Sequence, residues 1–351
     1  MKKKNKESIK TKVFGHEHLV TLDDIAQGII PVVAKLLHKA GFRESLAKTL
    51  RKVFFWSDTD DLDRIANFLL SVGLSRKDLF KRLKTFGNTG DEYVIITIDQ
   101  EFMGRGKVPK SYRQQILEVT ELIDAGEPIK LVVHIDPRRK NYMELLYEFE
   151  NYISGVKMYN YMGYFPYDIR LQPLWKKCAK KKWFVVFHCS PGNINWYGGK
   201  DIDMLLKHSK YPLYKTGKSN KEKSKNFGNP LGMINVAIDN PKVNFIIEHL
   251  GGKEEAEKYW RGEKDTWTEL LIESAIENPN IYLGTSFTTY TKPMQMLVGQ
   301  VLKRLPKQLI WGCDYNVCES EAFVTDYTQE LRKEIGDENF YMIANNIRKL
   351  L

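Results

Sequence analysis

The order of short apolar segments along the chain constrains its fold more than any other feature. These segments are rich in Val, Ile, Phe and Tyr. Several are almost continuously apolar, as expected for strands that are covered on both faces in a parallel sheet. They cover residues 12–18, 93–99, 129–136, 155–159, 183–189, 244–250, 281–287 and 309–314. The pattern therefore predicts about eight strands.

Amphipathic segments separate most of the predicted strands. They cover residues 113–126, 141–153, 171–181, 266–279 and 292–306. Three of them end at or next to Gly126, Pro279 and Pro306, and these residue types commonly terminate helices. The alternation of strands and helices predicts an α/β fold, specifically a (β/α)8 TIM barrel. An open doubly wound sheet is the alternative, but no GxGxxG motif follows a predicted strand.

Two longer segments interrupt this alternation. Residues 25–90 are predicted to form a mostly helical insertion after the first strand, and residues 190–232 a long loop after the fifth strand. In a barrel both would emerge at the carboxyl-terminal face, where active sites lie, and the loop has the length of a lid. We expect residues 1–351 to form one barrel domain that carries these two insertions.

Composition argues against several classes of protein. The chain lacks the apolar run of about 20 residues that a membrane span requires. Its basic start, MKKKNKESIK, is not followed by the apolar segment of a secretory signal. Four Cys in 351 residues do not make a disulfide framework. These features predict a cytoplasmic protein that does not bind membranes.

The net charge raises the question of a nucleic-acid partner. The chain carries 54 Lys and Arg against 44 Asp and Glu, a net charge of +10, and seven lysines lie between positions 207 and 225. No RRM, KH or helix-turn-helix motif accompanies them, so we expect no specific nucleic-acid partner. The Lys-rich segment is interpreted as a solvated surface, or as one that steers an anionic small-molecule substrate. A homodimer is left open.

Polar side chains gather where the predicted strands end. The chain has seven His, and five of them occupy such positions. The polar residues are His16 and His18 of the first strand, Asp99 of the second, His134 and Asp136 of the third, Lys157 of the fourth, His188 of the fifth, His249 of the sixth and Asp314 of the eighth. Because the carboxyl ends of barrel strands converge, we expect these groups to surround one site.

The first strand carries the most suggestive spacing. His16 and His18 are two positions apart, so both imidazoles point to the same face while Glu17 points away. Two imidazoles arranged in this way can chelate one divalent metal ion, although a polar turn would explain the same residues. Together with His188, His249 and Asp314 they predict a metal site with nitrogen and oxygen ligands.

Each of the other candidates also has a structural explanation. His188 and His249 taken singly are compatible with buried structural histidines, and Asp314 with a helix N-cap. His134 is interpreted as a structural residue or as a partner of a metal ligand. Lys157 is either paired with a neighbouring carboxylate or carbamylated by CO2, which would convert it into a carboxylate that bridges two metal ions.

These residues lie in motifs that resemble those of the amidohydrolase superfamily, in particular its amidohydrolase-related branch of metal-dependent TIM-barrel hydrolases and decarboxylases. The likeness extends over nearly the whole chain, from His16 to Asp314. Its motifs are the HxH of the first strand, HIDPRRK (134–140), GVKMYNYMGYFPYD (155–168), FHCSPG (187–192), NPKVNFIIEHLGG (240–252) and WGCDYN (311–316).

The resemblance implies a divalent metal cofactor, one or two ions, with Zn as the expected metal and Mn as the alternative. It assigns the first ion to His16, His18, His188 and Asp314, a bridging position to Lys157, and a second ion or a catalytic role to His249. The implied mechanism is metal-assisted attack by water. Asp314 would accept the proton of the water, and His249 would polarise the scissile carbonyl.

The implied activity is hydrolysis of an amide, ester or lactone-type bond in a small molecule. A metal-dependent non-oxidative decarboxylase on the same scaffold is the alternative. That branch typically lacks the lysine and ends its fifth strand in HP, whereas this chain has Lys157 and HCSPG. A non-catalytic basic binding protein is the third hypothesis. Tyr159, Tyr161 and Arg105 are expected to contact the substrate, and packing or solvated loop positions would explain them equally well.

Overall fold

The computed structural model describes residues 10–29, 71–191, 195–213, 217–317 and 323–351. Most of the predicted helical insertion, residues 30–70, lies outside these ranges. Its last part is described and contains α4 (Arg76–Lys84). Residues 192–194 and 214–216 of the predicted lid-like loop also lie outside the described ranges.

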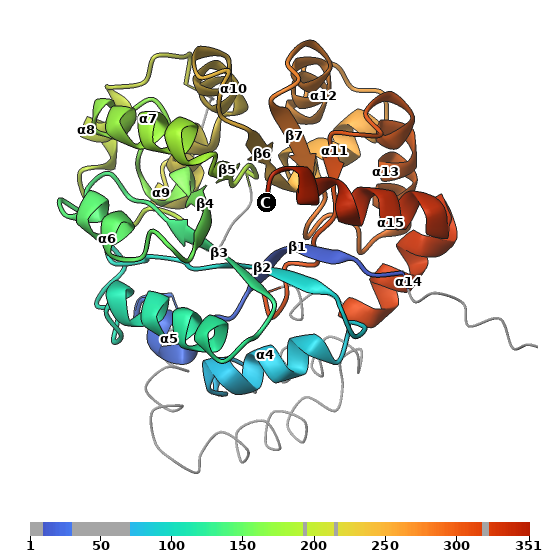
Figure 1. The fold of residues 1–351 in the computed structure, drawn as a ribbon. Helices are drawn as coiled ribbons and strands as arrows, with labels where there is room; N and C mark the ends of the chain where they lie inside the picture. Colours follow the sequence, from blue (N-terminus) through green and yellow to red (C-terminus); the bar gives the residue numbers. More distant parts are fainter. Residues whose placement is uncertain (1–9, 30–70, 192–194, 214–216, 318–322) are drawn as a thin grey trace, which may run out of the picture.

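Eight parallel strands form one sheet in chain order (Figure 1). They are β1 (Val13–His18), β2 (Glu92–Ile96), β3 (Ile129–His134), β4 (Ile153–Met158), β5 (Phe184–Phe187), β6 (Phe245–Ile247), β7 (Ile281–Gly284) and β8 (Leu309–Ile310). The N–H of Gly15 donates to the carbonyl of Trp311 (3.2 Å), and the N–H of Asp314 donates to the carbonyl of His16 (2.8 Å). These two bonds join the first and last strand regions, and the predicted TIM barrel is confirmed.

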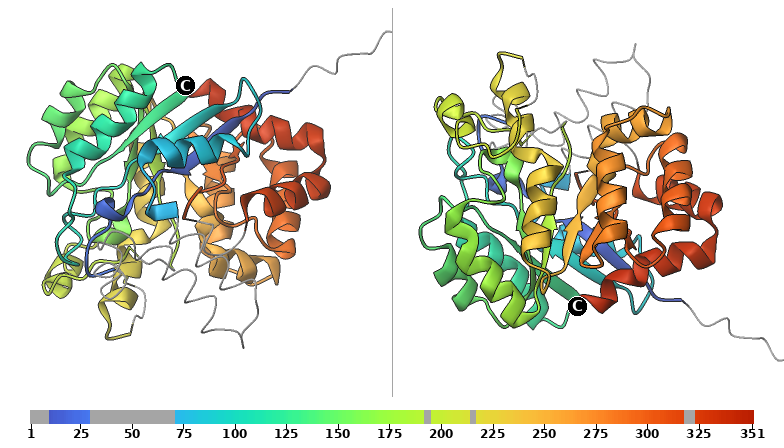
Figure 2. Two further views of the ribbon diagram at one scale, coloured as in Figure 1. Left: turned by 90° about the horizontal axis from the view of Figure 1, so that it is seen from below. Right: turned by 90° about the horizontal axis from the view of Figure 1, so that it is seen from above.

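Helices cover the outside of the barrel (Figure 2). They are α5 (Tyr112–Asp124), α6 (Tyr142–Glu148), α7 (Gln172–Lys181), α10 (Pro230–Asp239), α11 (Lys253–Trp260), α12 (Trp267–Glu277), α13 (Lys292–Arg304), α14 (Val324–Ile335) and α15 (Asp337–Asn345), with the short α8 (Ile202–Leu206) and α9 (Asn220–Ser224) in the segment after β5. All five predicted helices are present. The helix predicted over 141–153 ends at Glu148, because Ile153 pairs with Leu131 as the first residue of β4.

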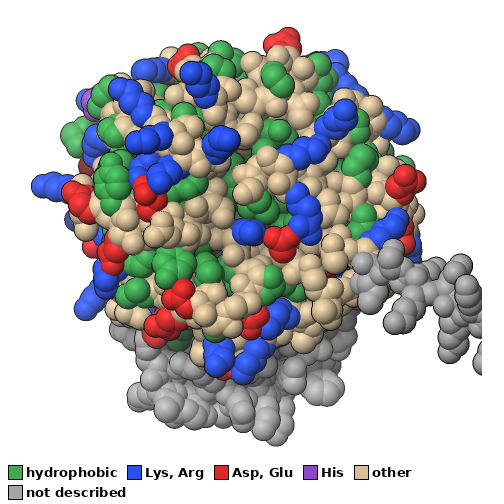
Figure 3. All heavy atoms as spheres, in the orientation of Figure 1, with side chains coloured by type: hydrophobic (Ala, Val, Ile, Leu, Met, Phe, Trp, Pro, Cys, Tyr) green, Lys and Arg blue, Asp and Glu red, His purple; other side chains and the backbone are tan. Residues whose placement is uncertain are grey.

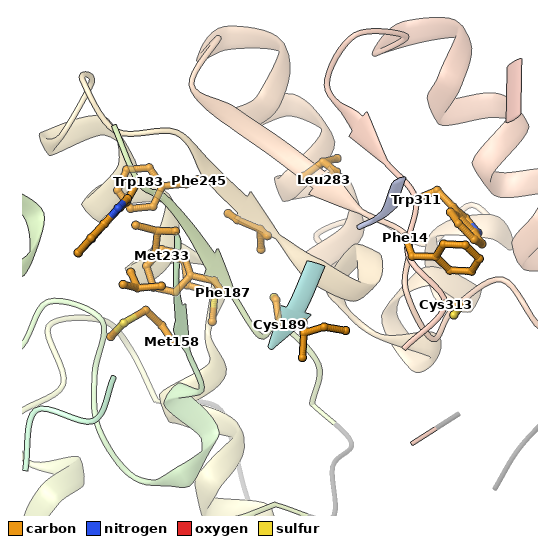
Figure 4. Packing of buried hydrophobic residues seen from close by; sticks show 14 of the residues in the cluster. Phe14, Met158, Trp183, Phe187, Cys189, Met233, Phe245, Leu283, Trp311 and Cys313 are labelled. Atoms are coloured by element: carbon orange, nitrogen blue, oxygen red, sulfur yellow. The ribbon is translucent and has the colours of Figure 1, made fainter. Parts of the chain in front are cut away.

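Side-chain alternation divides the apolar core into two layers. One layer lies inside the barrel and contains Val13, Val94, Ile96, Val132, Phe184, Val186, Ile246 and Ile310, together with Ile347 and Leu350 near the C-terminus. The next residues along the strands point outward against the helices (Figure 4). In this outer layer Phe187 stacks on Phe245, and Phe14 packs against Trp311.

The C-terminal residues lie over one end of the barrel. Leu350 and Leu351 line a cavity with Ile153 and Trp183, at or next to the starts of β4 and β5. The C-terminus accordingly lies at the centre of the ring of strands in Figure 1. The opposite end, where the strands finish, is therefore the end at which the predicted site residues gather.

The surface shows no single basic stripe on the face seen in Figure 3, where Lys and Arg side chains are dispersed among acidic and apolar ones. Among the helices that the structure describes, none is both long and apolar enough to cross a membrane.

The contact between β1 and β8 leaves no room for a side chain at Gly15. A Cβ atom there would lie 2.5 Å from the carbonyl oxygen of Trp311, the same oxygen that accepts the Gly15 N–H. We predict that Gly15→Ala lowers the free energy of unfolding by about 2 kcal/mol, because overpacking must displace backbone. Urea denaturation measures this change.

Gly299→Ala provides the matched control. Gly299 lies inside α13, and a Cβ atom there would meet only Ile335 at 3.7 Å. This variant should be neutral or more stable by up to about 1 kcal/mol, because Ala favours a helix over Gly. Equal free energies of unfolding for the two variants would contradict the tight packing of the β1–β8 contact.

Candidate metal centre

Three of the predicted ligands converge at the carboxyl end of the barrel. His16 and His18 end β1, and Asp314 follows β8. One potential ligand atom from each of these buried residues lies within 4.8 Å of the others, so the group could hold a metal ion. Nε2 of His18 is 3.3 Å from Oδ1 of Asp314, an oxygen that has no hydrogen-bond partner in the described structure.

Backbone carbonyls orient two of the imidazoles. Nδ1 of His18 donates to the carbonyl of Ile96 (2.9 Å), and Nδ1 of His249 donates to the carbonyl of Ser286 (2.8 Å). Because a carbonyl only accepts, each neutral ring carries its proton on Nδ1 and has a lone pair on Nε2. A second partner that holds the ring in this way is the usual arrangement of histidine metal ligands.

A carboxylate lies beside the ring of His16, although the contact lacks the geometry of a hydrogen bond. Nδ1 of His16 is 2.9 Å from Oε1 of Glu248, which precedes His249 in the chain. The hydroxyl of Ser286 donates to the other oxygen of Glu248 (2.6 Å). Gly284 makes room for this carboxylate, since a Cβ atom at Gly284 would lie 1.8 Å from it. Sequence reasoning missed Glu248, and its position directly before a strand-end histidine is the feature that could have found it.

His188 and His249 form a second group beside the first. Nδ1 of His188 is 2.9 Å from Nε2 of His249, and the two ring centres are 4.5 Å apart. Lys157 is fully buried next to them, with Nζ at 3.4 Å from Nε2 of His16. His188 thus contacts His249, while the resemblance assigns it to the first ion with His16, His18 and Asp314.

Burial makes these rings neutral. It lowers the pKa of His249 to about 3, and lowers the pKa values of His16, His18 and His188 well below their ordinary range. Neutral imidazoles are the form that binds metal ions. Burial also raises the pKa of Asp314 against the opposing effect of Lys157, and lowers the pKa of Lys157.

The same chain matches a known family over more than half of its length. A family model described as Amidohydrolase matches residues 142–344. The chain belongs to the amidohydrolase family. Members of this family typically bind divalent metal ions, and the cluster of His16, His18 and Asp314 is a group that could hold one.

Solved structures support the fold of this chain. An uncharacterized TIM-barrel protein from Bordetella bronchiseptica is 15% identical, with a TM-score of 0.55 over 97% of this chain and 98% of the other. An amidohydrolase from Burkholderia multivorans is 10% identical, with a TM-score of 0.56 over 97% and 99%. A putative amidohydrolase from Staphylococcus aureus is 15% identical, with a TM-score of 0.52 over 97% and 99%. A search of curated proteins found no match.

A cavity of about 480 Å³ opens beside the two histidine groups. His18, His188, His249 and Asp314 contribute to its polar wall, and Ile98, Tyr159, Phe287 and Val317 to its apolar wall. Ser190, Asn195 and Lys221 also line it, so the segment after β5 borders the cavity. A larger cavity of about 560 Å³ at the opposite end of the barrel contains none of the predicted site residues.

The three residues expected to contact substrate differ in position. Tyr159 lines the cavity, and its ring stacks on His188 with centres 4.1 Å apart. Tyr161 is not among the described residues that line the cavity, since its hydroxyl donates to the carbonyls of Pro191 and Lys221. Arg105 is likewise elsewhere. It donates to the carbonyl of Gly28, and its guanidinium stacks on Trp196.

Both ring nitrogens of His134 bind groups outside the set of candidate ligands. Its Nδ1 accepts the N–H of Asp99 (2.9 Å), so Nε2 carries the proton and donates to the hydroxyl of Tyr164 (3.2 Å). That hydroxyl also accepts the N–H of Tyr159 (2.8 Å), which fixes the start of the loop after β4. These bonds support the structural role expected for His134.

The buried His134 ring predicts a pH dependence of stability. Burial lowers the pKa of His134 to about 3 in the folded state. Its contribution to stability is therefore complete above the unfolded pKa and is lost as the pH falls. The parent should lose stability as the pH falls from about 6.5 to 5. We predict that this loss of unfolding free energy is smaller by about 1.5 kcal/mol in His134→Asn, when both proteins are free of metal.

Urea titrations at the two pH values measure this difference. His208→Asn is the control, because His208 is exposed on the segment after β5. Its stability should change with pH as that of the parent does. An identical pH dependence of the parent and of His134→Asn would contradict the effect of His134 burial.

Proposed function

We propose that the protein is a metal-dependent hydrolase that cleaves an amide, ester or lactone-type bond of a small molecule. The observation that carries the proposal is the convergence of His16, His18 and Asp314 at the mouth of the barrel. Nε2 of His18 is a lone pair, because the Nδ1 proton of this ring is bound to a carbonyl, and it lies 3.3 Å from the Asp314 oxygen that has no hydrogen bond in the described structure. Such an arrangement suits an ion rather than a hydrogen-bonded polar cluster.

The residues divide into positions for one or two ions. His16, His18 and Asp314 would hold the first ion, and His188 with His249 would hold the second. Lys157 lies beside His16, where a carbamate on its Nζ would supply the oxygen atoms that join the two positions. Imidazole and carboxylate ligands favour Zn, with Mn as the alternative. A bound divalent ion would supply Lewis acidity, which lowers the pKa of water towards neutrality.

Asp314 is proposed to move the proton. Asp314 lines the cavity, its Oδ1 has no hydrogen bond in the described structure, and burial raises its pKa towards the range of an efficient proton acceptor. In this role it takes the proton of the attacking water and delivers it to the leaving group.

His249 is better suited to bind an ion than to polarise a carbonyl. Its Nε2 has no proton to donate, and its low pKa keeps the ring neutral. The lone pair of Nε2 accepts the Nδ1–H of His188, and a bound ion would replace that hydrogen bond. The atom cannot donate a hydrogen bond to a developing oxyanion. The resemblance implies that His249 either binds a second ion or polarises the scissile carbonyl, and this hydrogen bonding favours the first role.

Metal analysis tests the centre directly. The purified protein is expected to contain one or two equivalents of Zn or Mn, and a His16→Ala, His18→Ala double variant should lose the ion of the first position. Elemental analysis after dialysis measures the content, with His208→Ala as the control that keeps it. Full metal content in the double variant would overturn the assignment.

Replacement of Asp314 tests its proposed role in proton transfer. Asp314→Asn keeps an oxygen ligand but removes the proton acceptor, so kcat in metal-saturated protein should fall by about 10²–10⁴-fold. Initial rates on a panel of amides, esters and lactones measure this loss. Release of CO2 from aromatic carboxylic acids, without hydrolysis of any member of the panel, would instead support a decarboxylase.

A further inference from the structure

The residue between the two metal-facing histidines has contacts of its own. Glu17 lies on the opposite face of β1 from His16 and His18, and its side chain is fully buried. Its Oε1 accepts the N–H of Cys313 (2.9 Å), and its Oε2 accepts the N–H of Tyr315 (2.9 Å). The thiol of Cys313 also donates to Oε2 (2.7 Å). One carboxylate therefore binds the residues on both sides of Asp314.

The backbone at Asp314 needs such support. Asp314 has a φ of +57°, a left-handed conformation that residues with a Cβ atom rarely adopt. Asn316, two positions later, has a φ of +50°. An extended chain would place the Asp314 carboxylate differently relative to His18, so the ligand position depends on this turn.

β1 and the residues after it supply most of the described hydrogen bonds that hold this turn. The N–H of Asp314 donates to the carbonyl of His16 (2.8 Å). The side chain of Asn316 donates to the carbonyl of Val20 (2.9 Å) and accepts the N–H of Val20 (3.4 Å). With the two bonds to Glu17, three consecutive N–H groups of the turn bind to the His16–Glu17 segment.

We propose that Glu17 is a positioning residue that fixes Asp314 for metal binding by clamping the backbone on both sides of it. The inference rests on the proposed function, because it concerns the same ion position. Glu17 does not face the ion. A single strand instead delivers two ligands on one face and, on the other face, the carboxylate that holds the third ligand. The middle residue of the HxH motif thus has a function of its own in this chain.

The Glu17→Gln variant tests the clamp with little change of shape. Its amide keeps one acceptor oxygen but turns an NH2 group towards the other backbone N–H. The dissociation constant for Zn, measured by chelator competition, should rise by about 10–100-fold, as is typical when a partner of a ligand is lost. Removal of Zn and urea denaturation give the stability of the same variant without metal.

Asp91→Asn is the matched control. Asp91 is a buried carboxylate that directly precedes β2 and lies beside the start of β1. It also accepts two backbone N–H groups, from Lys12 (2.9 Å) and Asn88 (2.8 Å). This variant should lose stability but keep the Zn affinity of the parent. Equal Zn affinities of Glu17→Gln and the parent, or equal losses of affinity in the two variants, would overturn the proposal.

Amide hydrogen exchange of the metal-free parent decides the case if Glu17→Gln does not fold. A clamp built by the protein predicts that the amides of Cys313, Asp314 and Tyr315 are protected before metal is added. Rapid exchange of these amides without metal, and protection only after Zn is added, would overturn the clamp. Failure of the parent to bind Zn would instead refute the proposed function, while the exchange pattern would still show whether Glu17 holds the turn.

Discussion

The hydrogen bonds between β1 and the segment after β8 are the contact on which the candidate site depends. They join parts of the chain that are nearly 300 positions apart, as in the bond from Cys313 to Glu17 with a separation of 296. The Gly15–Trp311 and His16–Asp314 backbone bonds close the ring at this seam. His16 and His18 belong to β1, and Asp314 belongs to the segment after β8. The same hydrogen bonds that close the barrel therefore also bring these three residues together.

Burial of polar groups is the second constraint. Each imidazole at the barrel mouth is shielded from water, so it stays neutral and its N–H group requires an acceptor. Carbonyls serve His18 and His249, and the Glu248 carboxylate lies against Nδ1 of His16. The buried carboxylates of Glu248 and Asp314 face only one buried ammonium, that of Lys157, in this part of the described structure. This excess of one negative charge would attract a divalent cation.

Much of the fold and part of the site could be predicted from the sequence. Apolar runs indicated all eight strands, and the polar residues that terminate them indicated the ligand candidates, because strand ends of a barrel converge. Tyr159 and Tyr161 show where such reasoning fails. Alternation would place both on one face, but β4 ends at Met158, and the turn after it directs the Tyr161 hydroxyl to Pro191 and Lys221. Arg105 binds partners in distant loops that no local pattern reveals.

The barrel, and the strand-end side chains at its mouth, can be predicted from the amino-acid order alone, because both follow from local periodicity and from the positions of polar residues in apolar strands. The grouping of those side chains depends on contacts between strands that are distant in the sequence. The orientation of each imidazole depends on an acceptor from a different strand region, such as Ile96 for His18 and Ser286 for His249. The pairing of His188 with His249, and the parts played by Glu17 and Glu248, therefore appear only when the strands lie side by side.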